Sequence, residues 1–194
     1  MRKLVAVEHL SLDGVMQAPG RPDEDLRDGF EHGGWAAPRS DAVIAQAMAG
    51  GMANAGAMLF GRRTYLDFFE VWPKRTNNPY TDVLNNSPKY VASTTLTQPL
   101  PWQNSTLIGG DVPAAVARLK KEDGKDLVVL GSGELLRSLM QHRLVDEFVL
   151  IIHPLVFGSG QRLFDDGGTF EKLRLMKATC TTTGVVISTY QILQ

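Results

Sequence analysis

Three short segments of the sequence place small, cationic or hydroxyl residues directly after an apolar run. In the first, residues 127–136, the aliphatic run ends at Leu130 and is followed by Gly131, Ser132 and Gly133. Small residues let a backbone approach a phosphate group closely, and the start of a helix presents unpaired N–H donors to an anion. This segment is therefore typical of a phosphate site, although a tight turn alone would use the same glycines.

The second segment, residues 58–65, combines a turn glycine with two arginines. Gly61 ends the apolar run, and Arg62, Arg63 and Thr64 open the helix that we expect to follow. Cations at the N-terminus of a helix oppose the helix dipole, so a bound anion would resolve this unfavourable arrangement. A guanidinium group suits a phosphate monoester. The alternative is a solvated first turn.

The third segment, residues 89–94, is a short apolar strand that ends in Ser93 and Thr94. Taken alone, these hydroxyl residues are ordinary turn residues. Ligands of open α/β sheets bind outside the carboxyl ends of the strands, where all three segments would meet. Together they predict a bound nucleotide that carries several phosphates.

Three carboxylates are candidates for moving a proton. Glu8 lies inside an apolar strand, where a carboxylate must be paired or have a raised pKa, so we expect it on the substrate side. Asp13 could donate a proton or orient its loop, and it also fits an ordinary turn. Asp41 fits the N-cap of a helix first and a catalytic acid second.

Other polar and aromatic residues have both a functional and a packing interpretation. Trp35 and Trp72 could stack on a flat substrate ring or pack in the protein interior. Arg162 could reach the cofactor or the substrate, or lie on the surface. His153 fits the end of a strand, and Cys180 fits a small packing residue.

The composition excludes several classes of protein. Among 194 residues, 20 are Lys or Arg and 21 are Asp or Glu, a balance that argues against a general nucleic-acid binder. The N-terminal apolar stretch is broken at Glu8 and His9, and the aliphatic run 148–152 is far too short to span a membrane. We expect a cytoplasmic protein that binds a small molecule and neither nucleic acid nor membrane.

Several familiar motifs are missing. A single cysteine and four histidines without ligand spacing predict no metal site. The ordinary dinucleotide fingerprint fails because Leu136 stands in place of its third glycine. The sequence also lacks the Gly-Lys-Ser/Thr of a P-loop and the Gly-x-Ser-x-Gly of a nucleophile elbow.

Hydrophobic periodicity predicts alternating strands and helices, and then paired strands at the C-terminal end. Residues 19–35 and 153–168 are expected as loops, the second with an extended piece at 162–164. Strands are expected at 3–10, 57–60, 89–93, 105–108, 126–130 and 146–152, helices at 41–53, 62–69, 81–85, 112–121 and 134–141, and a hairpin at 172–182 and 185–193. This order predicts an α/β fold with a mostly parallel sheet and an antiparallel edge.

The order of these motifs resembles the dihydrofolate reductase-like superfamily, and most closely the reductase domain of riboflavin biosynthesis. The residues that carry the resemblance are 11–14 (Ser-Leu-Asp-Gly), 61–65 (Gly-Arg-Arg-Thr-Tyr), 89–94, 129–135 and 154–164, which includes Gly158-Ser159-Gly160. The resemblance implies one three-layer α/β/α domain over 1–194 and NADPH as the cofactor. The deaminase domain that is often fused to such reductases is absent from the sequence.

The resemblance also assigns roles by position. Arg62 and Arg63 would face the 2′-phosphate, Thr64 the pyrophosphate, and the backbone at Glu8 and His9 the nicotinamide carboxamide. The implied cofactor contacts are His9, Gly61, Arg62, Arg63, Thr64, Ser93, Thr94, Leu130, Gly131, Ser132, Gly133, Glu134 and Leu135. The catalytic candidates are Asp13, Glu8 and Asp41, and the substrate candidates are Trp35 and Arg162.

Two departures bear on the substrate. Leu130 stands where riboflavin-pathway reductases tend to carry an acidic substrate-binding residue, and Asp41 lies farther from Gly61 than the acid of dihydrofolate reductases does. We expect hydride transfer to a small heterocycle, imine or carbonyl, such as a pyrimidine intermediate. A pterin reductase and an NADPH-binding protein without turnover are the alternatives. The resemblance implies a homodimer, for which the strand 148–152 offers a buried edge.

Overall fold

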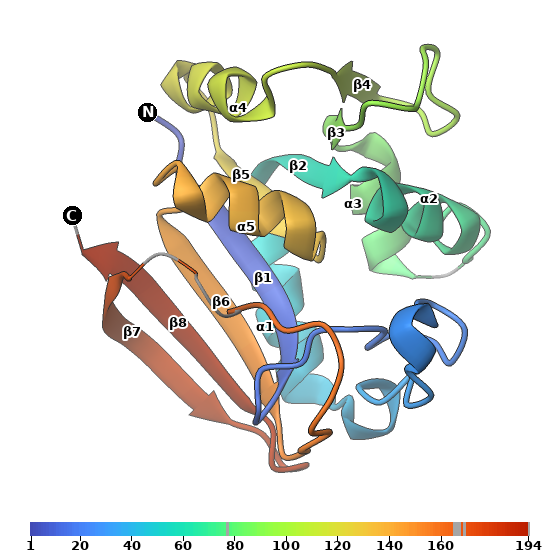
Figure 1. Ribbon diagram of the computed structural model, residues 1–194, viewed down its shortest axis with the longest axis vertical. Helices are drawn as coiled ribbons and strands as arrows, with labels where there is room; N and C mark the ends of the chain where they lie inside the picture. The colour runs from blue at the N-terminus through green and yellow to red at the C-terminus, as the bar shows by residue number, and fades with distance from the viewer. Residues whose placement is uncertain (77, 165–167, 169, 194) are drawn as a thin grey trace.

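The computed structural model describes residues 1–76, 78–164, 168 and 170–193, and of Pro79 the backbone alone. In this part of the chain eight strands form one sheet in the order β4-β3-β2-β5-β1-β6-β8-β7 (Figure 1). The strands are β1 (Leu4–Ser11), β2 (Ala55–Gly61), β3 (Lys89–Ala92), β4 (Ser105–Ile108), β5 (Asp126–Leu130), β6 (Glu147–His153), β7 (Lys172–Cys180) and β8 (Val186–Leu193).

The strand directions confirm the predicted mixed sheet. Every pairing from β4 across to β6 is parallel, whereas β8 runs antiparallel to both β6 and β7. Because β2, β3 and β5 run parallel, their carboxyl ends share one edge of the sheet, as the motifs require.

The expected loop at 153–168 includes residues 165–167, which lie outside the described residues.

Helices cover both faces of the sheet, which confirms the three layers. The helices are α1 (Ala42–Ala53), α2 (Arg62–Val71), α3 (Pro79–Asn86), α4 (Val112–Lys121) and α5 (Gly133–Gln141), with short 3₁₀ turns at Arg27–Gly29 and Ala37–Arg39. Side chains of α4 and α5 pack into one hydrophobic cluster, and those of α1, α2 and α3 pack into clusters on the opposite face. Figure 1 shows α5 in front of the sheet and α1 behind it.

The strand β5 illustrates why the sequence folds this way. Its four aliphatic residues are all buried. Leu127 and Val129 belong to the cluster under α4 and α5, while Val128 and Leu130 belong to the cluster under α1, α2 and α3. A parallel strand covered on both faces is apolar throughout, because its alternate side chains enter different cores.

Capping residues set the helix starts. Asp41 caps α1, because its Oδ1 accepts hydrogen bonds of 3.0 Å from the N–H groups of Val43 and Ile44. Asn78 caps α3 in the same way, with Tyr80 N–H as the donor at 2.9 Å. This cap explains why α3 begins two residues before the expected start at Thr81.

Two interpretations of the C-terminal half were wrong. The strand β6 lies between β1 and β8, so residues 148–152 offer no free edge. The edge strand is β7, whose residues are mostly exposed. Cys180 is exposed at the end of β7 and does not pack in the interior.

Candidate active site

A cavity of about 910 Å³ opens beside the carboxyl ends of β2 and β5 and runs along β1 toward α1. One part is lined by Gly61, Arg63, Thr64 and residues 130–135. The other part is lined mainly by apolar side chains of α1, α2 and α3. These are Ile44, Ala45, Met48, Met52, Phe68, Val71, Trp72, Tyr80 and Leu84. A cavity of this size holds a drug-sized molecule, and its position is typical of ligand sites in α/β sheets.

The turn between β5 and α5 has a backbone that few residues tolerate. Gly131 has a φ of +61°, and a Cβ placed there would lie 3.2 Å from Cγ2 of Thr64. Ser132 follows in the left-handed region with a φ of +69°. Its Oγ accepts a hydrogen bond of 2.9 Å from Gly61 N–H, so the turns after β2 and β5 are joined directly.

This arrangement leaves the starts of two helices open to the cavity. The Ser132 side chain forms no cap on α5, because it is bonded to Gly61, and α2 likewise has no side-chain cap. The first backbone bond into α5 reaches Leu136 N–H, so the described residues provide no acceptor for the N–H groups of Gly133, Glu134 and Leu135. Uncapped N–H groups beside a glycine turn fit the phosphates of a dinucleotide.

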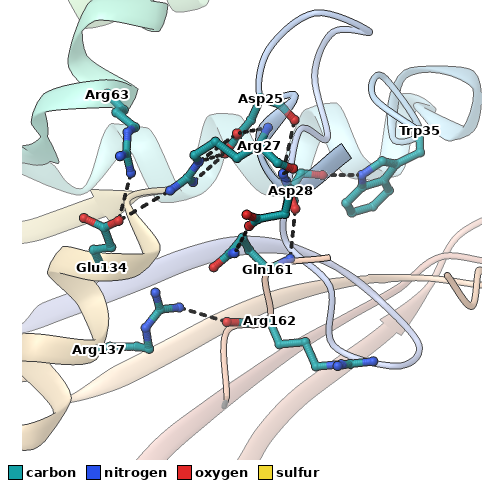
Figure 2. Close-up of polar contacts among 10 residues, drawn as sticks. Asp25, Arg27, Asp28, Trp35, Arg63, Glu134, Arg137, Gln161 and Arg162 are labelled. Carbon is teal, nitrogen blue, oxygen red and sulfur yellow. Dashed lines mark hydrogen bonds and ion pairs between the residues drawn. The ribbon is translucent and has the colours of Figure 1, made fainter. Parts of the chain in front are cut away.

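Charged residues surround this end of the cavity (Figure 2). Arg63 Nη1 lies 2.8 Å from Oε1 of Glu134, and Arg27 Nη1 lies 3.4 Å from the same oxygen. The bond from Arg63 lowers the pKa of Glu134. Arg27 is also paired with Asp25, so the charges of these two arginines and two carboxylates balance. Arg62 is exposed and does not line the cavity, so the helix turns the two predicted arginines to different sides.

The predicted hydroxyl residues after β3 lie apart from this cavity. Oγ of Ser93 accepts hydrogen bonds from the N–H groups of Thr95 and Leu96 at 3.1 and 3.0 Å. Neither Ser93 nor Thr94 lines the cavity. The structure therefore brings two of the three predicted phosphate segments together and gives the third an internal turn role.

Segment 17–27 lines the cavity and lies across it, and we refer to it as the covering segment. Arg21 Nη2 bonds Oδ1 of Asp67 on α2 at 2.6 Å. Arg27, held by Asp25, reaches Glu134 on α5. The covering segment is thus tied to both helices whose N-termini face the cavity. Sequence reasoning assigned this stretch to a loop and missed these pairs.

Glu8 is the buried carboxylate that the sequence predicted, and it lines the cavity. Its side chain shares the face of β1 that carries Leu4, Ala6 and Leu10. Glu8 is 3% exposed, and its Oε1 has no hydrogen-bond partner within the described residues. Burial raises the pKa of this carboxyl well above its ordinary value.

His9 points to the opposite face of β1, where it meets a second histidine that sequence reasoning did not connect to it. Nδ1 of His9 lies 2.9 Å from Nε2 of His153 on β6. Trp35 packs its ring edge-to-face on His153 at 5.1 Å between centroids. Desolvation by burial lowers the pKa of both imidazoles to about 4. The signal was available, because His9 lies near the end of β1 and His153 at the end of β6, two strands that pair in parallel.

Four of the five predicted catalytic and substrate residues lie outside the cavity lining. Asp13 accepts hydrogen bonds from Ser11 Oγ at 2.6 Å and from Gly158 N–H at 2.9 Å. Burial alone would raise its pKa, but these bonds outweigh burial and lower the pKa to about 2. Arg162 Nε donates to the Asp13 carbonyl at 3.0 Å, and its guanidinium points away from Glu134 (Figure 2). Both residues therefore hold loop segments together.

Asp41 and Trp35 also serve the fold. Oδ2 of Asp41 accepts hydrogen bonds from both N–H and Oγ1 of Thr182, so both carboxylate oxygens of the cap are engaged. Trp35 is buried, and its Nε1 donates to the Gln17 carbonyl at 2.7 Å. Of the three predicted proton donors, only Glu8 contacts the cavity.

The described residues form neither a candidate metal site nor a candidate membrane-spanning helix. Within the described ranges, no group of three or more His, Cys, Asp or Glu side chains could hold a metal ion. None of the helices described is both long and apolar enough to cross a membrane.

The strand order and the cavity beside its carboxyl edge define a protein with the dihydrofolate reductase-like fold. The structure superposes on dihydrofolate reductase from Enterococcus faecalis complexed with NADP(H), with a TM-score of 0.62, 12% identity, and coverage of 99% of this chain and 97% of that one. A putative riboflavin biosynthesis protein from Shewanella sp. PV-4 gives a TM-score of 0.70 at 18% identity and 99% coverage of both chains.

Residues 2–187 match the model of the RibD C-terminal domain, and the chain belongs to this family. The uncharacterized protein YyaP of Bacillus subtilis (strain 168) is 30% identical over 139 residues, which cover 69% of this chain and 72% of the relative. The chain also superposes on 57% of a diaminohydroxyphosphoribosylaminopyrimidine deaminase/5-amino-6-(5-phosphoribosylamino)uracil reductase from Thermotoga maritima, with 99% of this chain covered, a TM-score of 0.65 and 13% identity.

Proposed function

We propose that this protein is an NADPH-dependent reductase that acts on a small heterocyclic, imine or carbonyl substrate. The observation that carries the proposal is the pair of uncapped helix N-termini, joined by Ser132 and Gly61, that face one cavity beside Arg63. Membership of the RibD C-terminal family and the likeness to a reductase complexed with NADP(H) support it.

The residues present fit the cofactor at one end of the cavity. The N–H groups of Gly133, Glu134 and Leu135 would bind the pyrophosphate with Thr64, and Gly131 provides a surface that a Cβ would obstruct. Arg63 would bind the 2′-phosphate, with Arg62, Ser93 and Thr94 toward the adenosine end. Backbone atoms of Glu8 and His9 would meet the carboxamide. When bound, NADPH supplies the hydride.

The chain itself orients the substrate and excludes water. The apolar side chains of α1, α2 and α3 would hold a flat molecule against β1. The covering segment would shield that molecule from solvent through the bonds of Arg21 and Arg27. Glu8 is the one of the three carboxylates that lines the cavity, on the face of β1 opposite the apolar side chains, and it would hold a proton there because Asp13 and Asp41 are engaged elsewhere.

A pyrimidine intermediate like that of riboflavin biosynthesis is one substrate of this class, given the Thermotoga maritima reductase. A pterin substrate is less well supported. In dihydrofolate reductases an acid on the first long helix assists protonation of the pterin, whereas the residues of α1 that line this cavity are Ile44, Ala45, Met48 and Met52. An NADPH-binding protein without turnover is the alternative of a different class.

Fluorescence titration with NADPH and NADH tests the cofactor assignment. We expect Arg63→Ala to weaken NADPH about tenfold or more and NADH far less, because a charge-assisted bond to the 2′-phosphate is lost. Arg62→Ala is the matched variant and should have a smaller effect, since Arg62 lies outside the lining.

The outcomes separate the alternatives. Equal losses of NADPH and NADH would remove the 2′-phosphate assignment. If the wild type bound neither nucleotide, both the reductase and the binding protein would be excluded. Tight NADPH binding without oxidation across pterins, pyrimidine intermediates and quinones would favour the binding protein.

We also propose a homodimer formed through the exposed edge strand. Leu173, Leu175 and Met176 of β7 are 38%, 53% and 55% exposed, and an exposed apolar edge strand invites pairing with another chain. Light scattering after size-exclusion chromatography should give twice the mass of 21.3 kDa. Leu175→Lys should shift the mass toward the monomer, and a monomeric wild type would contradict the proposal.

A further inference from the structure

We infer that the apolar part of the cavity, between β1 and helices α1, α2 and α3, selects a flat molecule that has a carbonyl oxygen and no positive charge, and that this oxygen accepts a hydrogen bond from Nε2–H of His9. The assignment rests on the proposed function for the location of the substrate. It assigns a specificity-determining role to His9 and a positioning role to His153.

The apolar part of the cavity has few polar groups on the face of β1 that carries His9. The described lining residues of α1 and α3 are apolar except for Tyr80, whose hydroxyl donates to the Ala45 carbonyl. Ser40, just before α1, is a further polar residue of the lining. The ring of His9 lies on this face, because Ile151, its partner in β6, packs against Ile44 of α1. His9 is thus a polar ring beside an apolar compartment.

The carboxylates of the cavity are committed elsewhere. Asp67 is paired with Arg21, Asp25 with Arg27, and Glu134 with Arg63. Glu24 accepts hydrogen bonds from two backbone N–H groups of the covering segment. Glu8 lies on the opposite face of β1, under α5. A cationic substrate would therefore find no free carboxylate in the described lining of the apolar compartment.

The buried histidine determines which nitrogen of His9 carries the hydrogen. His153 is 0% exposed, and its Nδ1 has no hydrogen-bond partner among the described residues. Buried N–H donors are rarely left without an acceptor, so Nδ1 of His153 is the bare nitrogen. The hydrogen of His153 is therefore on Nε2 and is donated to Nδ1 of His9.

It follows that His9 carries its own hydrogen on Nε2. No hydrogen bond to Nε2 is formed by the residues that the structure describes, and His9 lines the cavity. A neutral imidazole N–H donates to an oxygen without adding a charge, and such a donor pairs with a carbonyl. Trp72 and Phe68 provide flat apolar surface for the remainder of the molecule.

Histidine ¹⁵N NMR tests the tautomers on the wild-type protein without a substrate. We expect His9 to be protonated on Nε2 and His153 on Nε2, both neutral from pH 8 to pH 6. The exposed His142 gives the reference signal and is assigned with His142→Phe. A hydrogen on Nδ1 of His9, or a charged pair at neutral pH, would overturn the inference.

Ligand discrimination tests the specificity with 1-indanone and indane, two flat probes that differ by one carbonyl oxygen. We expect 1-indanone to bind about tenfold more tightly than indane and to shift the Nε2 signal of His9. The double variant His9→Phe/His153→Phe removes both polar partners at similar volume, so it should fold and should bind both probes alike. His153→Phe alone should reduce the preference, because Nδ1 of His9 loses its donor.

The controls separate this inference from the proposed function. NADPH binding by the wild type, measured by the titration described above, tests the proposed function independently of the probes, because the phosphate contacts lie in the other part of the cavity. A preference for 1-indanone that survives the double variant, or its absence in the wild type, would contradict the role of His9. Loss of NADPH binding in the wild type would instead contradict the proposed function, whatever the probes show.

Discussion

Ser132 Oγ and Gly61 N–H form a hydrogen bond of 2.9 Å across 71 residues of sequence. The bond fixes the turn after β2 against the turn after β5, and these two turns line the end of the cavity where we propose that the phosphates bind. It also explains why α5 has no side-chain cap, since the Ser132 hydroxyl is already used. One serine thus joins the two halves of the site and leaves the helix start open.

Replacing Ser132 tests this connection. Ser132→Ala leaves the half-buried Gly61 N–H without its acceptor, so we expect a loss of about 1–2 kcal/mol in the free energy of unfolding and several-fold weaker NADPH binding. Ser132→Gly loses the same bond but relieves the positive φ, so its stability loss should be smaller. Urea denaturation and fluorescence titration measure both effects. Equal stability of Ser132→Ala and the wild type would show that the bond is not needed.

Gly131→Ala tests the backbone cradle. The φ of +61° is unfavourable for alanine by about 1–2 kcal/mol, and the new Cβ would lie 3.2 Å from Cγ2 of Thr64. We expect lower stability and weaker NADPH binding. Thr64→Ser removes Cγ2, so adding it to Gly131→Ala should recover part of the binding but not the cost of the dihedral angle. If the double variant bound no better than Gly131→Ala, the contact with Thr64 would not matter.

Glu8→Gln tests the buried carboxyl through pH. The folded pKa of Glu8 is raised, so the folded state holds the proton more strongly than the unfolded chain does. The stabilising contribution is present below the unfolded pKa of about 4.5 and is lost as the pH rises through the folded pKa. Glutamine does not titrate, so the melting temperature of Glu8→Gln relative to the wild type should increase from pH 5 to pH 8. A difference in melting temperature that stays constant across this range would contradict the raised pKa of Glu8.

The histidine pair predicts acid sensitivity of the opposite sign. Both imidazoles have a folded pKa of about 4, against an unfolded pKa of about 6.5, so the unfolded chain binds more protons between these values. Stability should fall as the pH drops from 6.5 to 4, by on the order of 3 kcal/mol for each of the two imidazoles. His9→Phe/His153→Phe should flatten this dependence in chemical denaturation series. An unchanged slope would place the acid sensitivity elsewhere.

Much of the fold could be predicted because it depends on local patterns. The aliphatic run of β5, the Asp41 cap of α1 and the glycines after β5 each identify a structure within a few residues. The same locality explains why the glycine turns of the site were found. The strand order, by contrast, follows from pairings between distant segments, and so the exposed edge was assigned to residues 148–152 and not to β7.

The rest of the site depends on contacts that no local pattern contains. His9 and His153 are 144 residues apart, and Arg27 meets Glu134 across 107 residues. The sequence left Asp13 as a candidate proton donor because Gly158, whose N–H donates to the Asp13 carboxylate, lies in a distant loop. Which of Arg62 and Arg63 faces the cavity depends on the rotation of α2 about its axis, which the packing of Tyr65 fixes.

The covering segment has a kinetic consequence. Its bonds to α2 and α5 are ion pairs with partly exposed side chains, Arg21 with Asp67 and Arg27 with Glu134. Such pairs weaken as dissolved salt screens their charges, whereas the buried strands beneath them are indifferent to salt. We therefore expect the rate at which the cavity admits and releases its contents to increase with the ionic strength of the solution, while the sheet keeps the shape of the cavity unchanged.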